Sequence, residues 1–273
     1  MQDVVSILML NAAVLLTIML ALWSLSIRLG DVSFIDSFWA FGFVIVAWIT
    51  FVLAGGDATG RNLIITGLTT VWGLRLGGYL FYRWRKEGPD KRYVALLNKA
   101  GEKRHQTSLQ KVFLLQGVLL WIVSLPVQLG QAAGPAALGP LAYAGALLCV
   151  VGIAFETIGD WQLMKFKENP DNAGKALDRG LWRYTRHPNY FGDACVWWGL
   201  FLIAAETSLG LFSIVGPMLL TFLLVKWSGA ALLERRLKRS RPEYADYIAR
   251  TSAFIPMPPK RAKQTTALSR NGR

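Results

Sequence analysis

The chain has 273 residues, of which 53% are hydrophobic, and its mean hydropathy of +0.35 exceeds what a soluble domain usually carries. Its net charge of +13 would suit a nucleic-acid-binding protein, but 27 of its 30 Lys and Arg residues are confined to 83–111, 160–192 and 226–273. Composition therefore excludes an ordinary soluble domain, and the placement of the charge indicates a membrane protein with no nucleic-acid partner.

Membrane-spanning helices are predicted wherever charged residues are missing for long enough. Asp, Glu, Lys and Arg are missing from 4–27, 37–56, 112–155 and 207–225, and about 20 such residues match a bilayer core. The third run is too long for one crossing and contains several Pro and Gly residues. We therefore divide it into two helices with a turn between them.

Two further stretches complete the prediction. Residues 62–82 are apolar except for Arg75, and residues 194–225 contain only Glu206, where a short turn would separate two helices. A cleaved signal peptide is the alternative for the first helix, but no basic residue precedes that helix and no clear cleavage site follows it. The sequence thus predicts an all-α integral membrane protein with seven transmembrane helices, at roughly 4–27, 35–54, 62–82, 112–129, 138–159, 193–206 and 208–227.

The basic residues also predict the orientation of the chain. All three basic stretches fall on one side of seven helices, and the positive-inside rule makes that side cytoplasmic. The N-terminus is therefore expected outside and the C-terminus in the cytoplasm. We see no internal repeat, and we predict one membrane domain over 1–259, followed by a disordered basic tail over 260–273.

The loops and cysteines are less informative. A short amphipathic segment containing Tyr93, Leu96 and Leu97 is expected at the membrane surface. Cys149 and Cys195 lie within predicted helices and lack the spacing of metal ligands. Neither a disulfide nor a metal site is expected.

Ionisable side chains at membrane depth are costly, which makes them functional candidates. They are Asp36, Arg75, Glu156, Asp160 and Asp193, and Glu156 and Asp160 share a helix face because they are four residues apart. A structural alternative exists for each carboxylate. At the membrane interface it can cap a helix end or pair with a loop arginine.

The stretch 160–193 concentrates the residues that could carry chemistry. Pro188 begins a predicted helix, so Asn189, Tyr190 and Asp193 would lie near a helix N-terminus, which favours anions. A pyrophosphate fits this pattern better than a neutral ligand, although the positive-inside rule alone equally predicts basic loop residues. Six basic residues precede the helix and can bond to phosphates: Lys165, Lys167, Lys175, Arg179, Arg183 and Arg186.

The same residues carry a family resemblance. The segment from Gly180 to Asp193, with Arg186-His187-Pro188-Asn189-Tyr190-Phe191-Gly192-Asp193, resembles the signature of membrane-embedded steroid 5-alpha-reductase-like proteins. It is also similar to sterol delta-14 and delta-7 reductases. The resemblance is specific over roughly 155–259 and loose over the first 150 residues. It looks most like a bacterial branch of that superfamily, which implies a multi-pass protein of the bacterial inner membrane.

The resemblance implies an enzyme that binds NADPH in its C-terminal half, 131–259, and a lipophilic enone between the helices of 1–130. His187 could donate a proton, but its place in a loop beside Pro188 favours an orienting role. Carried over to this chain, the implied cofactor-binding residues are Asp160, Lys167, Arg179, Arg186, His187, Asn189, Tyr190, Asp193, Tyr244 and Tyr247.

The implied catalytic residues are those that bind the substrate ketone. Steroid reductases use a Glu in helix two and a Tyr in helix three, and the candidates here are Asp36 with Tyr79 or Tyr82. Hydride addition to a conjugated alkene leaves negative charge on the carbonyl oxygen, so a donor is needed there. Because Asp36 stands where the family has a Glu, this chain departs from the family's pattern at the substrate ketone and not at the cofactor.

Two other classes of function stay open. Isoprenylcysteine carboxyl methyltransferases and phospholipid methyltransferases share the Arg-His-Pro segment, and they use S-adenosylmethionine, which has no phosphate. The basic residues of 165–186 and Asn189 after Pro188 favour the reductase instead. A transporter would use Arg75 and the intramembrane carboxylates as an ion path, but no inverted repeat is visible. The expected partners are therefore a lipophilic small molecule and the lipid bilayer.

Overall fold

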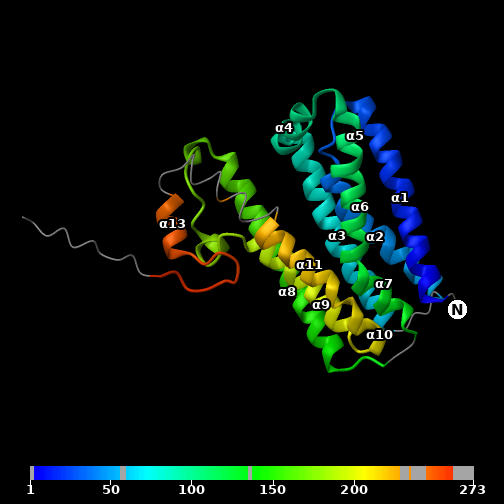
Figure 1. Ribbon diagram of the computed structural model, residues 1–273. Coiled ribbons are helices and arrows are strands. Elements are labelled where there is room, and N and C mark those ends of the chain that lie inside the picture. Colours follow the sequence, from blue (N-terminus) through cyan, green and yellow to red (C-terminus); the bar gives the residue numbers. More distant parts are fainter. Residues whose placement is uncertain (1–2, 56–59, 135–136, 228–233, 235–243, 261–273) are drawn as a thin grey trace, which may run out of the picture. The chain divides into compact units, whose positions relative to one another are not determined.

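The computed structural model describes residues 3–55, 60–134, 137–227, 234 and 244–260, and most of these are helical (Figure 1). The chain forms two compact units. The large unit comprises 1–153 and 194–221, and the small unit comprises 154–193 and 222–273. The predicted division at residue 130 into a substrate half and a cofactor half concerns function and stays a prediction.

Three long helices begin the large unit: α1 (Val4–Leu29), α2 (Ile35–Leu53) and α3 (Gly60–Glu87). Helix α1 begins where Asp3 accepts a hydrogen bond from the amide of Ser6 (2.7 Å). Helices α2 and α3 pack closely because Gly73 has no side chain. A Cβ atom there would lie 2.9 Å from the carbonyl oxygen of Ala40. The structure confirms the first three predicted helices and extends the third to Glu87.

The next helical stretch is longer than predicted, and the expected loop over 83–111 is largely helix. After Val123 the helix breaks, because Pro126 has no amide hydrogen and its ring would clash with the carbonyl of Ile122. The single predicted helix over 112–129 is therefore corrected. The elements are α4 (Lys91–Ala100), η1 (Gly101–Lys103), α5 (Arg104–Ser108), η2 (Leu109–Leu114), α6 (Leu115–Val123) and α7 (Leu125–Ala132).

Helices α8 (Pro140–Glu168) and α9 (Pro188–Ala204) each contribute to both units. In the large unit they meet at Gly145 and Gly199, where a Cβ on either residue would lie 2.5 Å from the other's carbonyl oxygen. The predicted turn at Glu206 is confirmed. The remaining elements are η3 (Pro170–Asn172), η4 (Gly180–Arg183), α10 (Ser208–Leu211), η5 (Phe212–Ile214), α11 (Val215–Phe222), η6 (Leu223–Trp227) and α13 (Tyr244–Arg250).

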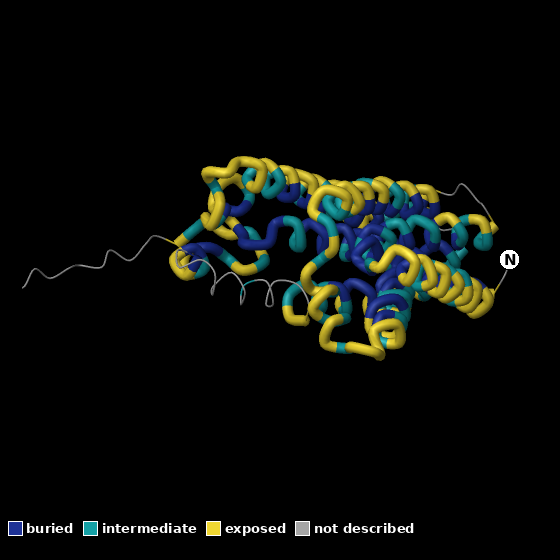
Figure 2. The backbone as a smooth tube through the Cα atoms, turned by 90° about the horizontal axis from the view of Figure 1, so that it is seen from above, coloured by how far each residue is buried: buried dark blue, intermediate teal, exposed yellow. Residues whose placement is uncertain are grey.

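Six helices in the described part of the chain are long and apolar enough to cross a membrane, whereas seven were predicted. The predicted helix over 193–206 is α9, which has 17 residues and is not among the six. Exposed surface runs along the helices (Figure 2) and carries large apolar side chains such as Val5, Met9 and Leu147, which a bilayer would cover. The predicted tail, apart from Lys260, lies outside the described residues.

Candidate functional site

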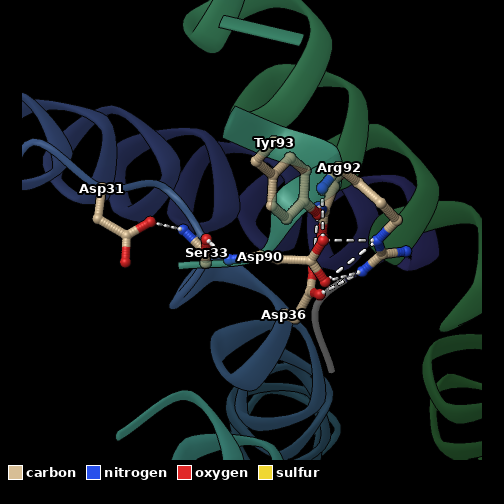
Figure 3. A network of polar contacts seen from close by, with 7 residues as sticks. Asp31, Ser33, Asp36, Asp90, Arg92 and Tyr93 are labelled. Carbon is tan, nitrogen blue, oxygen red and sulfur yellow. Dashed lines mark hydrogen bonds and ion pairs between the residues drawn. The ribbon is translucent and has the colours of Figure 1, made fainter. Parts of the chain in front are cut away.

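A cluster of charged and hydroxyl side chains lies in the large unit, where α2 and α4 begin (Figure 3). Oδ1 of Asp36 accepts a hydrogen bond from the hydroxyl of Tyr93 (2.6 Å), and Oδ2 forms an ion pair with Nη2 of Arg92 (3.1 Å). The Asp36 side chain is 22% exposed. We call Asp36, Arg92, Tyr93 and Gln116 the Asp36 cluster.

The connection from α3 to α4 explains why Arg92 reaches this position. Gly88 has a φ of 74° and turns the chain at the end of α3. Asp90 then caps α4 by accepting from the Arg92 amide (2.7 Å), and its own amide donates to Ser33 Oγ (2.7 Å). Burial raises the pKa of Asp90, but the hydrogen bonds from Arg92 outweigh burial, and the pKa lies below its ordinary value.

Gln116 completes the cluster from α6. Its Nε2 donates to the Tyr93 hydroxyl oxygen (2.8 Å), while the Tyr93 proton is directed to Asp36. The tyrosine oxygen is therefore held on two sides. The sequence indicated for Tyr93 only a place on an amphipathic segment and did not point to Gln116. The available signal for Gln116 was a polar side chain inside the otherwise apolar run 112–123.

The predicted tyrosines of α3 have other contacts. The Arg75 guanidinium lies over the Tyr79 ring, 5.8 Å from its centroid, and the Lys86 ammonium lies 5.7 Å from the centroid of Tyr82. Tyr82 is 48% exposed. The hydroxyl that bonds to Asp36 belongs to Tyr93 of α4, and the assignment of Tyr79 or Tyr82 to a substrate ketone stays a prediction.

In the small unit, Arg186 and His187 share one carboxylate. Nε of Arg186 lies 2.8 Å and Nε2 of His187 lies 3.0 Å from Oε1 of Glu234. Burial raises the pKa of Glu234, but the hydrogen bonds from His187 and Arg186 outweigh burial and lower it to about 2. Arg186 also donates through Nη1 to the carbonyl oxygens of Ile248 and Thr251. Nε and Nη1 of Arg186 are thus engaged within the protein.

Four of the predicted cofactor-binding residues come together where α9 begins. Nδ2 of Asn189 donates to Oδ1 of Asp160 in α8 (3.2 Å). The ring of Tyr190 stacks on that of His187, with centroids 5.3 Å apart and an interplanar angle of 8°. His187 is buried and held by both Tyr190 and Glu234. This arrangement favours the orienting role over direct proton donation.

The other predicted cofactor residues also belong to the small unit. Tyr247 donates to the carbonyl oxygen of Trp182, and its ring meets the Tyr244 ring edge-on at 5.5 Å. Burial raises the pKa of Tyr247 above its ordinary value. Tyr244, Tyr247 and Asp193 are buried.

The predicted basic residues of the small unit lie on its surface. Lys167 and Arg179 are exposed, and the Arg179 guanidinium lies over the Phe166 ring, 5.7 Å from its centroid. The surface-accessible basic residues are the ones suited to meet a phosphate.

The Asp36 cluster can stabilise negative charge on an oxygen atom. The Tyr93 hydroxyl and the Arg92 guanidinium both donate to the Asp36 carboxylate, and the Gln116 amide donates to the Tyr93 oxygen. The structural alternative for Asp36, pairing with a loop arginine, is also present. Arg92 makes a second ion pair with Asp90 (2.9 Å), however, and does not depend on Asp36 alone.

Apolar helices of bilayer-spanning length with exposed apolar side chains define the chain as a multi-pass membrane protein. It belongs to the family described as "Protein of unknown function (DUF1295)", which matches residues 22–251. No curated protein and no solved structure matches the chain. The matched region contains both the Asp36 cluster and the residues around His187.

Proposed function

We propose that the chain is a membrane-embedded reductase that uses NADPH to reduce the C=C bond of a lipophilic enone. The observation that carries the proposal is the Tyr93 hydroxyl, supported by Gln116 and directed at Asp36. Hydride addition leaves negative charge on the carbonyl oxygen of the enone, and a hydroxyl donor there stabilises that charge. The Tyr93 O–H is directed to the Asp36 side, where a substrate oxygen would receive it while Arg92 continues to neutralise Asp36.

The small unit supplies the groups suited to the cofactor. NADPH provides the hydride when bound, and its phosphates require Lys or Arg partners. Lys167, Arg179 and Arg183 are exposed basic side chains of this unit and fit that requirement. Arg186 orders the segment through its ion pair with Glu234. The resemblance of the segment 180–193 to membrane reductases supports the same assignment.

A methyltransferase that uses S-adenosylmethionine is the second candidate. It is favoured by the engagement of Arg186 with Glu234 and by the buried carboxylates Glu156, Asp160 and Asp193 of the small unit. A sulfonium carries positive charge and no phosphate, so carboxylates suit it better than basic residues do. We rank this function second because it assigns no role to the bond between Tyr93 and Asp36.

Ligand binding to the purified protein in detergent separates the two functions. NADPH is expected to bind, and to bind more tightly than NADH because the additional phosphate needs a basic partner. Asn189→Ala should weaken this binding, whereas Asn98→Ala, an exposed change on α4, should not. Affinity for S-adenosylmethionine without affinity for NADPH would end the reductase proposal.

We also propose that the N-terminus lies outside the cell and the basic stretches in the cytoplasm, which the one-sided Lys and Arg residues support. In a variant that lacks Cys149 and Cys195, a single cysteine introduced by Ala100→Cys or Lys175→Cys should react with a membrane-impermeant reagent only after the membrane is opened. Labelling of intact cells at either position would show that this position lies outside and would contradict the proposed orientation.

A further inference from the structure

We infer that Gln116 is a positioning residue for Tyr93 and that the π-helical segment η2 exists in this fold to bring Gln116 to the tyrosine. The inference rests on the proposed function, because it concerns how the donor to the substrate oxygen is held. Gln116 acts through Tyr93 and need not touch the substrate. Three observations carry it: the helical phase around η2, the direction of two hydrogen bonds, and the packing of α6.

The helical phase shows what η2 does. Residues seven apart lie on one face of an uninterrupted α-helix. Ser108 is 3% exposed, yet Leu115, seven residues later, is 47% exposed. Gln116 is half-buried in its place. The Leu115 amide bonds to the carbonyl of Gln110, five residues back, which is the π-helical spacing. The one additional residue turns α6 by about 100° relative to α5, and it exchanges Leu115 for Gln116 on the inner face.

The packing of α6 fixes this phase. A Cβ on Gly117 would lie 3.1 Å from Cγ of Met19 in α1, and Leu120 is fully buried against Gly42 of α2. Both neighbours of Gln116 along the inner side of α6 are therefore in contact with other helices. Gln116 cannot turn away from Tyr93 by a rotation of α6 without breaking these contacts.

The two hydrogen bonds at Tyr93 have opposite directions. Gln116 donates to the phenol oxygen (2.8 Å), and the phenol donates to Asp36 (2.6 Å). A donor on one side of the phenol oxygen favours an O–H that points to the other side, and each bond polarises the next. With Gln116 in place, the Tyr93 proton is directed to Asp36, and a substrate oxygen on that side would receive it.

Gln116→Leu tests the inference, with Gln110→Leu as the matched control, because Gln110 is an exposed glutamine of the same helical stretch. We expect Gln116→Leu to lower kcat for enone reduction about tenfold, with the KM for NADPH unchanged and Gln110→Leu near wild type. The kcat of Gln116→Glu should be lower still, because a carboxylate would accept the Tyr93 proton instead of donating a hydrogen bond to the Tyr93 oxygen. Deletion of one residue within 109–114 should reproduce the Gln116→Leu effect although Gln116 is still present.

A second readout separates this inference from the proposed function. The Raman doublet of a tyrosine ring reports whether its oxygen donates or accepts, and subtraction of a Tyr93→Phe spectrum isolates Tyr93. Gln116→Leu should change the doublet from donor-and-acceptor to donor alone. An unchanged doublet would overturn the positioning role. A changed doublet in a protein that reduces no enone would leave the role of Gln116 intact and remove the reductase proposal.

Discussion

The hydroxyl oxygen of Tyr93 lies 2.6 Å from Oδ1 of Asp36, although 57 residues separate them in the chain. The contact joins the first turn of α2 to the first turn of α4, and Gln116 of α6 holds its other side. Three helical segments therefore meet at one phenol oxygen.

Tyr93→Phe should abolish most of the turnover and leave cofactor binding intact. Loss of one donor to a developing oxyanion costs about 10²–10³ in rate, and the phenylalanine ring still fills the site. Tyr143→Phe is the matched control, because Tyr143 is exposed on α8. Turnover of an enone and NADPH affinity are measured on the same preparations. Full turnover by Tyr93→Phe, or an equal loss in Tyr143→Phe, would contradict the assignment.

Asp36→Asn distinguishes a functional carboxylate from one that only pairs with Arg92. The amide oxygen can still accept from Tyr93, while the ion pair with Arg92 is lost. Arg92 retains Asp90, and partly exposed ion pairs contribute only about 0–1 kcal/mol, so the unfolding midpoint should change little. We expect turnover to fall while thermal stability in detergent stays near wild type. The reverse result, full turnover with a clear loss of stability, would assign Asp36 a structural role.

Glu234→Gln should remove a pH-dependent part of the stability of the small unit. The pKa of Glu234 is lowered to about 2 from an ordinary 4.5 by its bonds to His187 and Arg186. A lowered carboxyl pKa contributes stability that is present above the unfolded pKa and is lost as pH falls through the folded pKa. Wild type should therefore lose this contribution between about pH 4.5 and pH 2, and the variant should lack it at every pH.

The measurement for Glu234 is the thermal unfolding midpoint in detergent as a function of pH, taken as the difference between variant and wild type. Glu168→Gln is the control, because the Glu168 carboxylate pairs with a lysine, Lys165, that is 58% exposed. A difference curve for Glu234→Gln that matches the control would show that the shared carboxylate adds nothing to stability.

Gly145→Ala should destabilise the large unit. The added Cβ would lie 2.5 Å from the backbone carbonyl oxygen of Gly199, and backbone cannot move aside as a flexible side chain can. Gly78→Ala is the control, because a Cβ there meets nothing within 4 Å on α3, and alanine has the higher helix propensity. The unfolding midpoint in detergent should fall for the first variant and hold or rise for the second. Equal midpoints would show that α8 and α9 do not depend on this crossing.

Much of the helical framework follows from the sequence because bilayer-spanning helices must be long and free of charge. The first three helices, the turn at Glu206 and the division of 112–155 at its Pro and Gly residues were predictable on that ground. In 83–111 the sequence indicated only the amphipathic segment that forms α4, because the charged residues hide the other helices from a search for apolar runs. The span predicted over 193–206 covers only part of α9, which begins at Pro188, because hydropathy does not show where a helix begins.

The sequence by itself determined which residues are costly to place in a membrane, and Asp36 was found in that way. It also placed Asp160, His187, Asn189 and Tyr190 in one stretch of special composition, and the structure brings these four together. Only the tertiary structure decided that Tyr93 contacts both Asp36 and Gln116, and that Glu234 pairs with Arg186. The physical reason is that helix period and hydropathy are local properties. A hydrogen bond between side chains far apart in sequence depends on how the helices pack, and here also on one additional residue in η2 that changes which face of α6 points inward.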